Sequence, residues 1–540
     1  MTQSLHWADW LVIAVYLVGL IAWAVYLSRG QHDRTDYYLG GRNIGHWPVA
    51  ISVMATQCST NSILGAPAFV AFTGGGLLWL QYELALPLAM IGLILLVMPV
   101  FRHFKLVSVY QFLEQRYDLR TRLLLSGLFL FIRAFATAVT VYSIAIVIDL
   151  ITGIGFFWSV ILLGVFTVVY DVFGGMRGVV YSDLLQMGIL LVVLLLVFYL
   201  LTADAGGLGQ LWASLPDDRK QTLAFDHHGL GDGQTFGFWP MLFGGLFLYM
   251  AYYGCDQSQV QRELSTRDID ATNKVLFING VFRFPLVLLY CFVGVGIAVF
   301  AINHGDFINQ LPSNDQGAPQ YNLAVPLYMI QTLPTGLVGL ALVALFAAAM
   351  SSLDSVLNSL SATTMEDFIV RFRSHPLTEE QEIWASRLVT TVWGAITLTM
   401  AFFVGDIAPT VLEAINKIGS LANGSILAVF ILALLSHNIT GLSVQAGLLS
   451  GIIVNALCWQ LLPEVSWLWW NVIGFFTTCV IAAVLTRINK NNLRLTPEAV
   501  HLATAAEVLN TEAKVNWRLA SLLLVAWFMA LLSILVWLNP

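Results

Sequence analysis

Continuous apolar runs of membrane-spanning length recur along the whole chain. Met187–Leu201 and Leu337–Met350 are two examples, and neither contains a charged residue. One transmembrane helix needs about 20 mostly apolar residues. A membrane β-barrel instead alternates apolar and polar residues in segments of about 10. The runs therefore predict an all-α polytopic membrane protein rather than a barrel.

The composition leaves no room for a large soluble domain. Hydrophobic residues make up 58% of the 540 residues and charged residues 11%, whereas a soluble protein carries about 25% charged residues. Hydropathy and loop signals together predict about fourteen transmembrane helices. Their expected ranges are 7–28, 47–72, 80–101, 123–152, 157–172, 183–203, 236–256, 276–303, 335–363, 386–405, 409–436, 440–462, 465–487 and 517–538.

Lysine and arginine are distributed unequally between the two sets of loops. The loops after the odd-numbered spans carry 20 of the 25 Lys and Arg residues, and the opposite loops carry only Arg219 and Lys220. Positive loops face the cytoplasm. We therefore expect both termini outside, in a plasma membrane. No glycosylation sequon lies in an expected outer loop, which favours a bacterial inner membrane.

Several classes of membrane protein lack support in the sequence. Because no lysine follows a glycine, a GxxxxGK[ST] nucleotide loop cannot occur, and no TVGYG-like filter is present. The five cysteines lie in apolar segments without CxxC spacing, so we expect neither disulfides nor a cysteine metal site. No basic cluster indicates a nucleic-acid partner. These absences favour a secondary transporter and not an enzyme, with a channel or membrane sensor as weaker alternatives.

Two predicted helices carry polar residues where a span should be apolar. In the second span, ATQCSTNS at 55–62 has six polar side chains in eight positions, and YYGCDQS at 252–258 interrupts the seventh span. Unsatisfied polar groups cost several kcal/mol in hydrocarbon, so such stretches line protein-enclosed water or bind a ligand. Interrupted helices at matching positions of two halves are typical of inverted-repeat transporters. The alternative is that Ser and Thr hydrogen-bond within their own helices.

The ninth span carries hydroxyl and carboxyl groups on one face. Residues 347–359 place serines and Asn358 at three- and four-residue spacing, beside small alanines and Asp354. Sodium is a hard cation that takes several oxygen ligands, including hydroxyls and backbone carbonyls. The alternative is a small-residue packing face. A carboxylate within the membrane costs at least about 2.5 kcal/mol and marks a candidate site. Asp183 and Glu83 could instead be solvated helix ends.

Six segments, in this order, resemble the sodium:solute symporter family over about residues 7–440. They are GGRNIG at 40–45, SILGAP at 62–67, SVYQFLEQR at 108–116, GGMRGVVYSDLLQ at 174–186, GCDQSQVQR at 254–262 and AAMSSLDS at 348–355. Two of them, the segment beginning at Gly254 and LGAP at 64–67, resemble the branch that carries iodide, monocarboxylates and water-soluble vitamins more than the sugar branch.

The resemblance implies a five-plus-five inverted-repeat (LeuT-type) fold with flanking helices and sodium-coupled uptake. Residues 1–46 would form an extra helix and a cytoplasmic loop, and residues 437–540 the C-terminal flanking helices with a cytoplasmic linker. The first repeat would occupy 47–203 and the second 236–436. We expect the protein to function as a monomer in the lipid bilayer.

The resemblance also implies which residues bind sodium and substrate. The shared sodium site would use carbonyls of Ala55, Cys58 and Ala348 with hydroxyls of Ser351 and Ser352. A second sodium site, present in some members, would correspond to Asp183, Asp354 and Ser355, although the family has serine where this chain has Asp354. Substrate contacts map to Gln57, Ser59, Ser62, Gln81, Tyr82, Glu83, Asp256 and Gln257, and the family's usual asparagine is replaced by Asp256.

Arg133 is a second distinctive charge, ten residues into its predicted span. An arginine at that depth needs a carboxylate partner or an anionic substrate. If it faces the cavity, a carboxylated substrate follows. If it neutralises Asp256 or Glu83, the substrate need not be charged, and a third alternative is that it snorkels to the inner face.

The sequence therefore predicts sodium-coupled symport of a small organic solute, with a carboxylated one favoured, by alternating access. Proton coupling through the intramembrane aspartates, or sodium-coupled sugar transport, are the alternatives. A membrane sensor is less favoured, because we expect no appended signalling domain after the last span.

Overall fold

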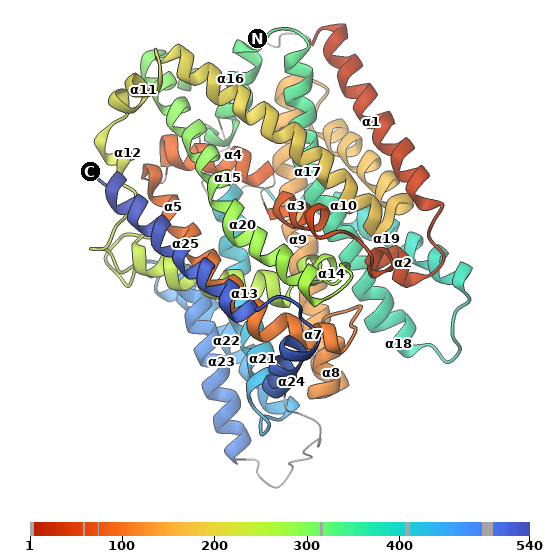
Figure 1. Ribbon diagram of the computed structural model, residues 1–540. Coiled ribbons are helices and arrows are strands. Elements are labelled where there is room, and N and C mark those ends of the chain that lie inside the picture. The colour runs from red at the N-terminus through yellow and green to blue at the C-terminus, as the bar shows by residue number, and fades with distance from the viewer. Residues whose placement is uncertain (1–4, 58–59, 74, 314–316, 406–410, 489–500) are drawn as a thin grey trace.

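The computed structural model describes residues 5–57, 60–73, 75–313, 317–405, 411–488 and 501–540. The described chain is helical throughout, with isolated bridges but no strand among its elements. Figure 1 shows the long helices packed obliquely into one bundle. The prediction of an all-α protein is confirmed.

Within the described residues, nine helical segments are long and apolar enough to cross a membrane. Seven of them are single helices: α1 (Trp7–Ser28), α9 (Leu119–Thr152), α10 (Phe156–Asp204), α15 (Ile269–Asn303), α22 (Gly441–Leu461), α23 (Trp469–Ile488) and α25 (Trp517–Leu538). The other two are composite: Gly76–His103 contains α5 (Trp79–Glu83), α6 (Ala85–Gly92) and α7 (Met98–His103), and Leu337–Phe372 contains α17 (Leu337–Thr363) and α18 (Val370–Phe372).

Shorter helices complete the bundle and its connections. Those of the bundle are α3 (His46–Gln57), α4 (Thr60–Ala68), α13 (Gly245–Cys255), α14 (Gln257–Glu263), α19 (Glu379–Ala401), α20 (Val411–Ser420) and α21 (Asn423–Leu435). Those of the connections are α2 (Arg34–Leu39), α8 (Gln111–Arg116), α11 (Leu208–Ser214), α12 (Asp217–Lys220), α16 (Ala324–Thr332) and α24 (His501–Thr511).

The fifth and sixth predicted spans lie in α10, in which two helices meet at a kink between the predicted ranges. The chain bends at Gly175, whose backbone has φ 54° and ψ −160°. A Cβ there would lie 2.8 Å from the Tyr37 carbonyl oxygen. Glycine therefore allows a sharp change of direction without the loop that the hydropathy profile predicts between 173 and 182.

Helix α17 lies at the centre of the packing and contacts α1, α3, α9 and α10. Its N-terminus is fixed by the buried carboxylate of Asp9 on α1. One carboxylate oxygen accepts hydrogen bonds from the backbone N–H groups of Gly336 and Gly339, each at 2.7 Å. An acidic group is favourable at a helix N-terminus. The helix that carries the predicted cation ligands is thus anchored at one end and packed along its length.

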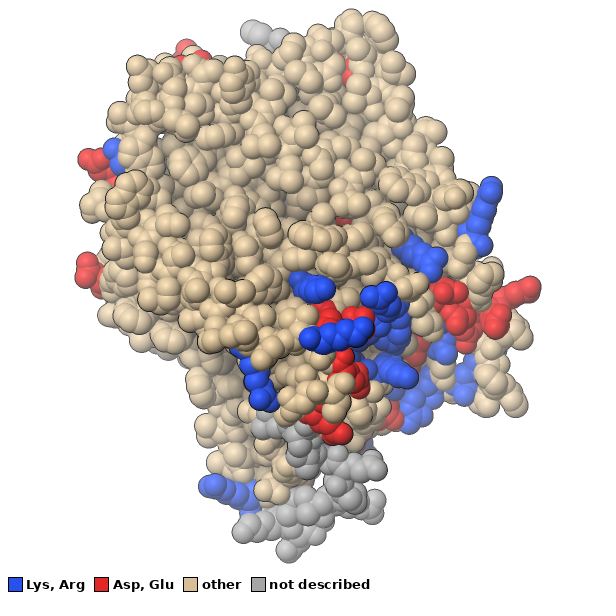
Figure 2. Space-filling model, in the orientation of Figure 1, with Lys and Arg blue, Asp and Glu red and all other residues tan. Residues whose placement is uncertain are grey.

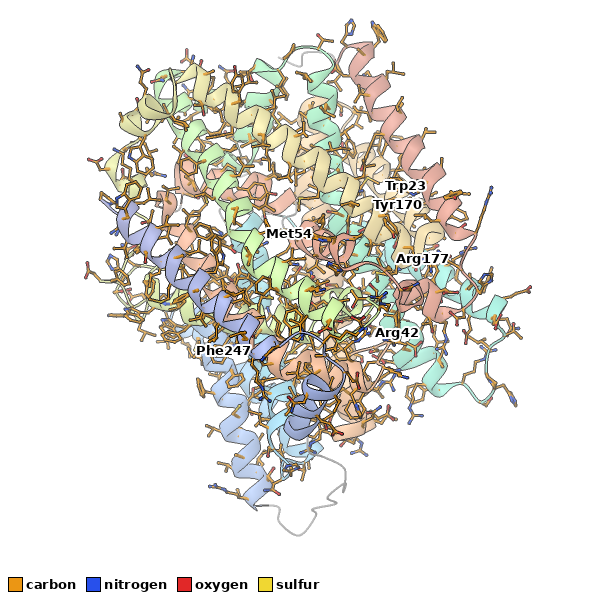
Figure 3. All side chains as sticks on the ribbon, in the orientation of Figure 1. Trp23, Arg42, Met54, Tyr170, Arg177 and Phe247 are labelled. Atoms are coloured by element: carbon orange, nitrogen blue, oxygen red, sulfur yellow. The ribbon has the colours of Figure 1, made fainter. Side chains whose placement is uncertain are left out.

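Charged side chains gather at one end of the bundle, around α2, α14, α18 and α24 (Figure 2). Arg42 and Arg177, labelled in Figure 3, belong to this end. There the buried Asp367 accepts hydrogen bonds from Arg122, Ser108 and Ser126.

Arg122 also pairs with Glu114 at 2.6 Å. Burial alone would raise the pKa of Glu114, but hydrogen bonds from Arg371 and Arg122 lower it below its ordinary value. This charged end contains the loops that the lysine and arginine count assigns to the cytoplasm.

Candidate substrate and cation site

The polar stretch of the second predicted span includes the last residues of α3 and the first residues of α4. Helix α3 ends at Gln57 and α4 begins at Thr60. Cys58 and Ser59, a predicted sodium ligand and a predicted substrate contact, lie outside the described residues. Ala55 is buried in the last turn of α3. The interruption that the sequence predicts at 55–62 thus falls in part outside the described residues.

The serines of α17 contact the end of α3 directly. The Ser352 hydroxyl donates to the carbonyl of Thr56 at 3.3 Å and to that of Ala348 at 3.4 Å. The Ser351 hydroxyl donates to the Ala348 carbonyl at 3.1 Å. In return, the Thr56 hydroxyl lies 3.3 Å from the Ser351 carbonyl oxygen. The structure thus places the Thr56 carbonyl, near the end of α3, beside the hydroxyl of Ser352 on α17.

Neutral oxygens dominate this contact. Within the described residues, no group of three or more His, Cys, Asp or Glu side chains could hold a metal ion. A monovalent cation needs several oxygen ligands but no concentrated negative charge. The chemistry of the α3–α17 contact is suited to sodium.

The residues of the second predicted cation site lie beside the first. The Ser52 hydroxyl donates to Asp183 at 2.5 Å, and Ser355 shares a 3.0 Å hydrogen bond with Thr56. Arg262, on α14, donates to the hydroxyls of Ser52 and Thr56 and lies 3.7 Å from Asp183. In the described part of the chain, Asp183 Oδ1 is buried without a hydrogen-bond partner.

Asp354 faces a different neighbour. Its carboxylate accepts a hydrogen bond from the hydroxyl of Tyr170, a residue of α10 labelled in Figure 3. The backbone N–H of Ser355 also donates to it. Asp354 therefore links α17 to α10. Asp183 and Ser355 instead contact α3, through Ser52 and Thr56.

The interruption in the seventh predicted span falls at Asp256, between α13 and α14. This residue has extended backbone geometry, φ −90° and ψ 122°, and its side chain caps α14 by accepting from the N–H of Ser258 at 2.8 Å. Its other carboxylate oxygen forms an ion pair with Arg133 of α9. The guanidinium carbon of Arg133 lies 4.9 Å from the centre of the Tyr252 ring. Arg133 therefore neutralises Asp256, the second of the three alternatives, and it also lines the cavity described next, as in the first of them.

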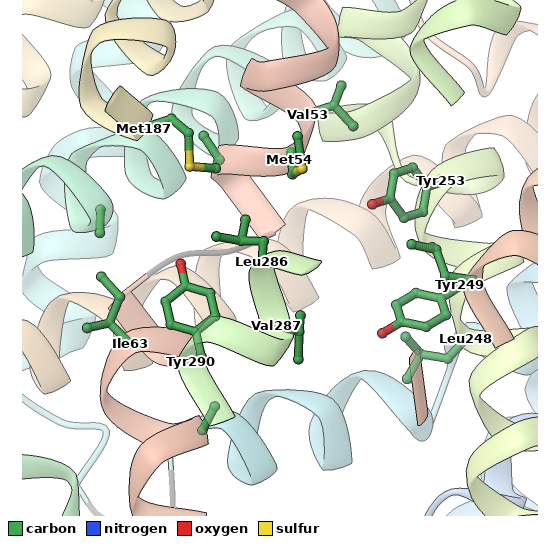
Figure 4. Close-up of a cluster of buried hydrophobic side chains, with 14 of the residues drawn as sticks. Val53, Met54, Ile63, Met187, Leu248, Tyr249, Tyr253, Leu286, Val287 and Tyr290 are labelled. Atoms are coloured by element: carbon green, nitrogen blue, oxygen red, sulfur yellow. The ribbon is translucent and has the colours of Figure 1, made fainter. Parts of the chain in front are cut away.

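A central cavity of about 130 Å³ is lined by residues of α3, α4, α5, α9, α13, α15 and α17. Figure 4 shows Leu248 and Tyr249 of α13 opposite Val287 of α15, three of the residues that line it. The predicted site residues that line the cavity are Gln57, Ser62, Tyr82, Glu83, Arg133 and Ser352.

A second ion pair lies in the wall of the central cavity. Arg283 of α15 donates to Glu83 at 3.0 Å, and the hydroxyl of Tyr249 donates to the other oxygen of Glu83 at 3.0 Å. The sequence interpretation did not assign Arg283, Tyr249 or Tyr252 to the site. Arg283 could have been found, because a charge within an apolar helix requires an acidic partner or a polar cavity.

Two predicted substrate contacts lie elsewhere. The amide of Gln81 is bonded to the N–H of Ala224 at 3.1 Å and to the carbonyl of Phe236 at 2.9 Å, so it fixes an outer loop. The amide of Gln257 is bonded to the N–H of Val109 at 2.8 Å and to the carbonyl of Val107 at 2.7 Å. Neither glutamine lines the central cavity.

Comparison with known proteins identifies the family of this chain. The family model described as "Sodium:solute symporter family" matches residues 37–455. The chain belongs to the sodium:solute symporter family. Its relatives are transporters rather than enzymes, and family membership makes this chain an integral membrane protein that couples solute transport to sodium.

Three relatives illustrate the range of solutes within the family. The sodium/sialic acid symporter NanT of Aliivibrio fischeri is 27% identical and covers 95% of this chain and 99% of its own. The sodium-dependent multivitamin transporter of Oryctolagus cuniculus is 29% identical over 84% of this chain and 70% of its own. The sodium-coupled monocarboxylate transporter 1 of Xenopus laevis is 28% identical over 83% and 71%.

Solved structures show that the fold is shared. A Na+-coupled sialic acid symporter in a substrate-bound outward-open state has a TM-score of 0.79 at 23% identity, over 89% of this chain and 98% of that one. MHP1, a nucleobase-cation-symport-1 family transporter, has a TM-score of 0.54 at 14% identity, over 89% and 99%.

Proposed function

We propose that this symporter carries a small carboxylated organic solute into the cell through the central cavity, coupled to sodium bound between α3 and α17. The observation that carries the proposal is the direct contact of Ser352 with the Thr56 carbonyl at the wall of that cavity. A cation at this contact joins the interrupted helix to α17, and solute binding beside it then depends on sodium.

The ligands proposed for this sodium are the carbonyls of Ala55, Cys58 and Ala348 and the hydroxyls of Ser351 and Ser352. A second sodium, at Asp183 and Ser355 with Asp354 nearby, is a further proposal supported by the unpartnered Asp183 oxygen. Each sodium moving inward down about 100 mV contributes about 2.3 kcal/mol. One ion therefore supports roughly a 50-fold solute gradient from the voltage alone.

A carboxylated solute is favoured by Arg133. Its guanidinium lines the central cavity, where a solute carboxylate can form the bidentate pair that arginine prefers. The named solutes of the relatives include sialic acid and monocarboxylates. Gln57, Ser62 and Tyr82, from α3, α4 and α5, are the proposed polar contacts for the rest of the molecule.

The finer architecture is also a proposal. About fourteen spans would form inverted repeats of five, at 47–203 and 236–436, with α3–α4 and α13–α14 as the matching interrupted helices. The charged end would face the cytoplasm of a bacterial cell and both termini the outside. Labelling with an impermeant thiol reagent tests the orientation: a cysteine at position 375 should react only from the cytoplasmic side, and reaction from outside contradicts it.

Uptake into proteoliposomes tests the proposed function. Sialic acid, pantothenate, lactate and glucose are offered with an inward gradient of sodium, of choline, or of protons without sodium. We expect one of the carboxylated solutes to accumulate only with sodium. Accumulation driven by protons alone would establish the alternative coupling ion, and sodium-driven uptake of glucose alone would reject the carboxylated class.

A further inference from the structure

A second cavity lies directly behind the central one. Its volume is about 80 Å³. The two cavities share a wall formed by Arg133, Ala136, Leu248, Tyr252 and Asn416. The proposed function assigns no step to the second cavity. A solute that moves from the central cavity into the second one has to pass the shared wall.

The second cavity lies toward the charged end of the molecule. Its remaining lining includes Tyr110, which immediately precedes α8, and Phe129, in the third turn of α9. Cys255 and Asp256 line it from the junction of α13 and α14. These segments lead to the loops assigned to the cytoplasm, so the second cavity lies on the inner part of the transport path.

The Arg133–Asp256 ion pair crosses the shared wall. Both the ε and one η nitrogen of Arg133 donate to the same oxygen of Asp256. The guanidinium also stacks on Tyr252, whose hydroxyl accepts a hydrogen bond from Gln259 of α14 at 2.6 Å. The other oxygen of Asp256 accepts from the hydroxyl of Ser258 at 2.6 Å. The pair thus connects α9 to the first turn of α14, across the break in the helix.

We propose that the Arg133–Asp256 ion pair is the inner gate between the central and the second cavity, with Asp256 as the residue that positions Arg133 in the closed state. The inference rests on the proposed function of the central cavity and goes beyond it. Because α13 and α14 separate at Asp256, movement of α14 away from α9 breaks the pair, takes Gln259 from Tyr252 and joins the two cavities.

The energetics of the pair suit a gate that opens only when something replaces Asp256. Both side chains are partly buried, with 18% and 13% of their surface exposed. Removing one partner of such a pair leaves the other charge without compensation, which is strongly unfavourable. A solute carboxylate in the central cavity compensates Arg133, and water in the second cavity compensates Asp256.

Thiol labelling from the inner side tests the gate. Thr137 is one turn beyond Arg133 on α9 and lines only the central cavity. Thr137→Cys is introduced into a variant without native cysteines, and an impermeant thiol reagent is added, without sodium or solute, at the face where a cysteine at position 375 reacts. We expect Asp256→Asn to raise the labelling rate at least tenfold and Asp256→Glu to leave it near that of the parent.

The matched control is Glu83→Gln, which breaks the other ion pair of the same cavity and should not change the rate. Equal rates in Asp256→Asn and the parent, or an equal rise in Glu83→Gln, overturn the gate. If Asp256→Asn does not fold, Arg133→Met breaks the pair from the other side, with the same expectation. Labelling needs neither sodium nor solute. If Asp256→Asn is labelled at the rate of the parent while the parent shows sodium-driven uptake, the gate alone is rejected. If Asp256→Asn is labelled faster but the parent shows no sodium-driven uptake, only the proposed function is rejected.

Discussion

Two glutamines that the family resemblance treats alike have different surroundings. Gln57 lines the central cavity and accepts a hydrogen bond from the hydroxyl of Tyr253, whereas Gln257 spans the loop at 107–109. Sequence position identifies both as residues next to an interruption. Only the path of a distant loop determines which amide faces the cavity, and one sequence does not reveal that path.

Replacing each glutamine should therefore have different effects. Gln57→Ala should raise the KM for the transported solute severalfold, because it removes a cavity contact. Gln257→Ala should lower the Tm with little change in KM, because it leaves a buried N–H and carbonyl of the loop unsatisfied, at about 1–3 kcal/mol each. Uptake kinetics and thermal unfolding in detergent measure the two effects. A KM that rises only in Gln257→Ala would contradict these assignments.

Charged residues were predictable as a class but not in their pairing. Asp183, Glu83, Arg133 and Asp256 stand out because ionised groups are expensive in hydrocarbon. The sequence left three alternatives for Arg133, and the observed pairing with Asp256 joins helices 123 residues apart in the chain. A hydropathy profile does not indicate which residues far apart in the sequence contact each other in the fold.

At the scale of elements, long apolar helices were the most predictable feature. Their length and apolar composition follow from the thickness of the bilayer and the need to satisfy every backbone group internally. The bend at Gly175 was not predictable, because nothing in the apolar pattern distinguishes a kinked helix from two helices with a short loop. The interruption at Asp256 was predictable, because polar side chains replace apolar ones at 252–258.

Close helix packing among the C-terminal helices depends on glycine. A Cβ at Gly424 of α21 would lie 1.8 Å from the carbonyl oxygen of Asn471 on α23. We expect Gly424→Ala to lower the Tm, by a loss of about 1–3 kcal/mol typical of overpacking. Gly188→Ala in α10, where a Cβ has no atom within 4 Å, is the control and should leave the Tm equal or slightly higher. Equal unfolding of both variants would contradict the packing.

At the scale of the whole molecule, the hydrogen bond between Ser352 of α17 and Thr56 of α3 lies at the wall of the central cavity, and the second cavity adjoins the central one. Helix α17 is anchored through Asp9 and Asp354 to α1 and α10. A cation that joins α3 to α17 therefore favours one position of α3 relative to these helices. Such differential binding is what couples an ion to a conformational change.

The sodium dependence of uptake in Ser352→Ala, compared with Ser359→Ala, tests this coupling most directly. Both serines lie on α17, but within the described residues the Ser359 hydroxyl donates only to the Ser355 carbonyl of its own helix, at 2.7 Å. Loss of one ligand worth about 1.4 kcal/mol should raise the half-saturating sodium concentration about tenfold in Ser352→Ala. Ser359→Ala should match the parent. Identical sodium dependence in all three proteins would contradict a sodium site between α3 and α17.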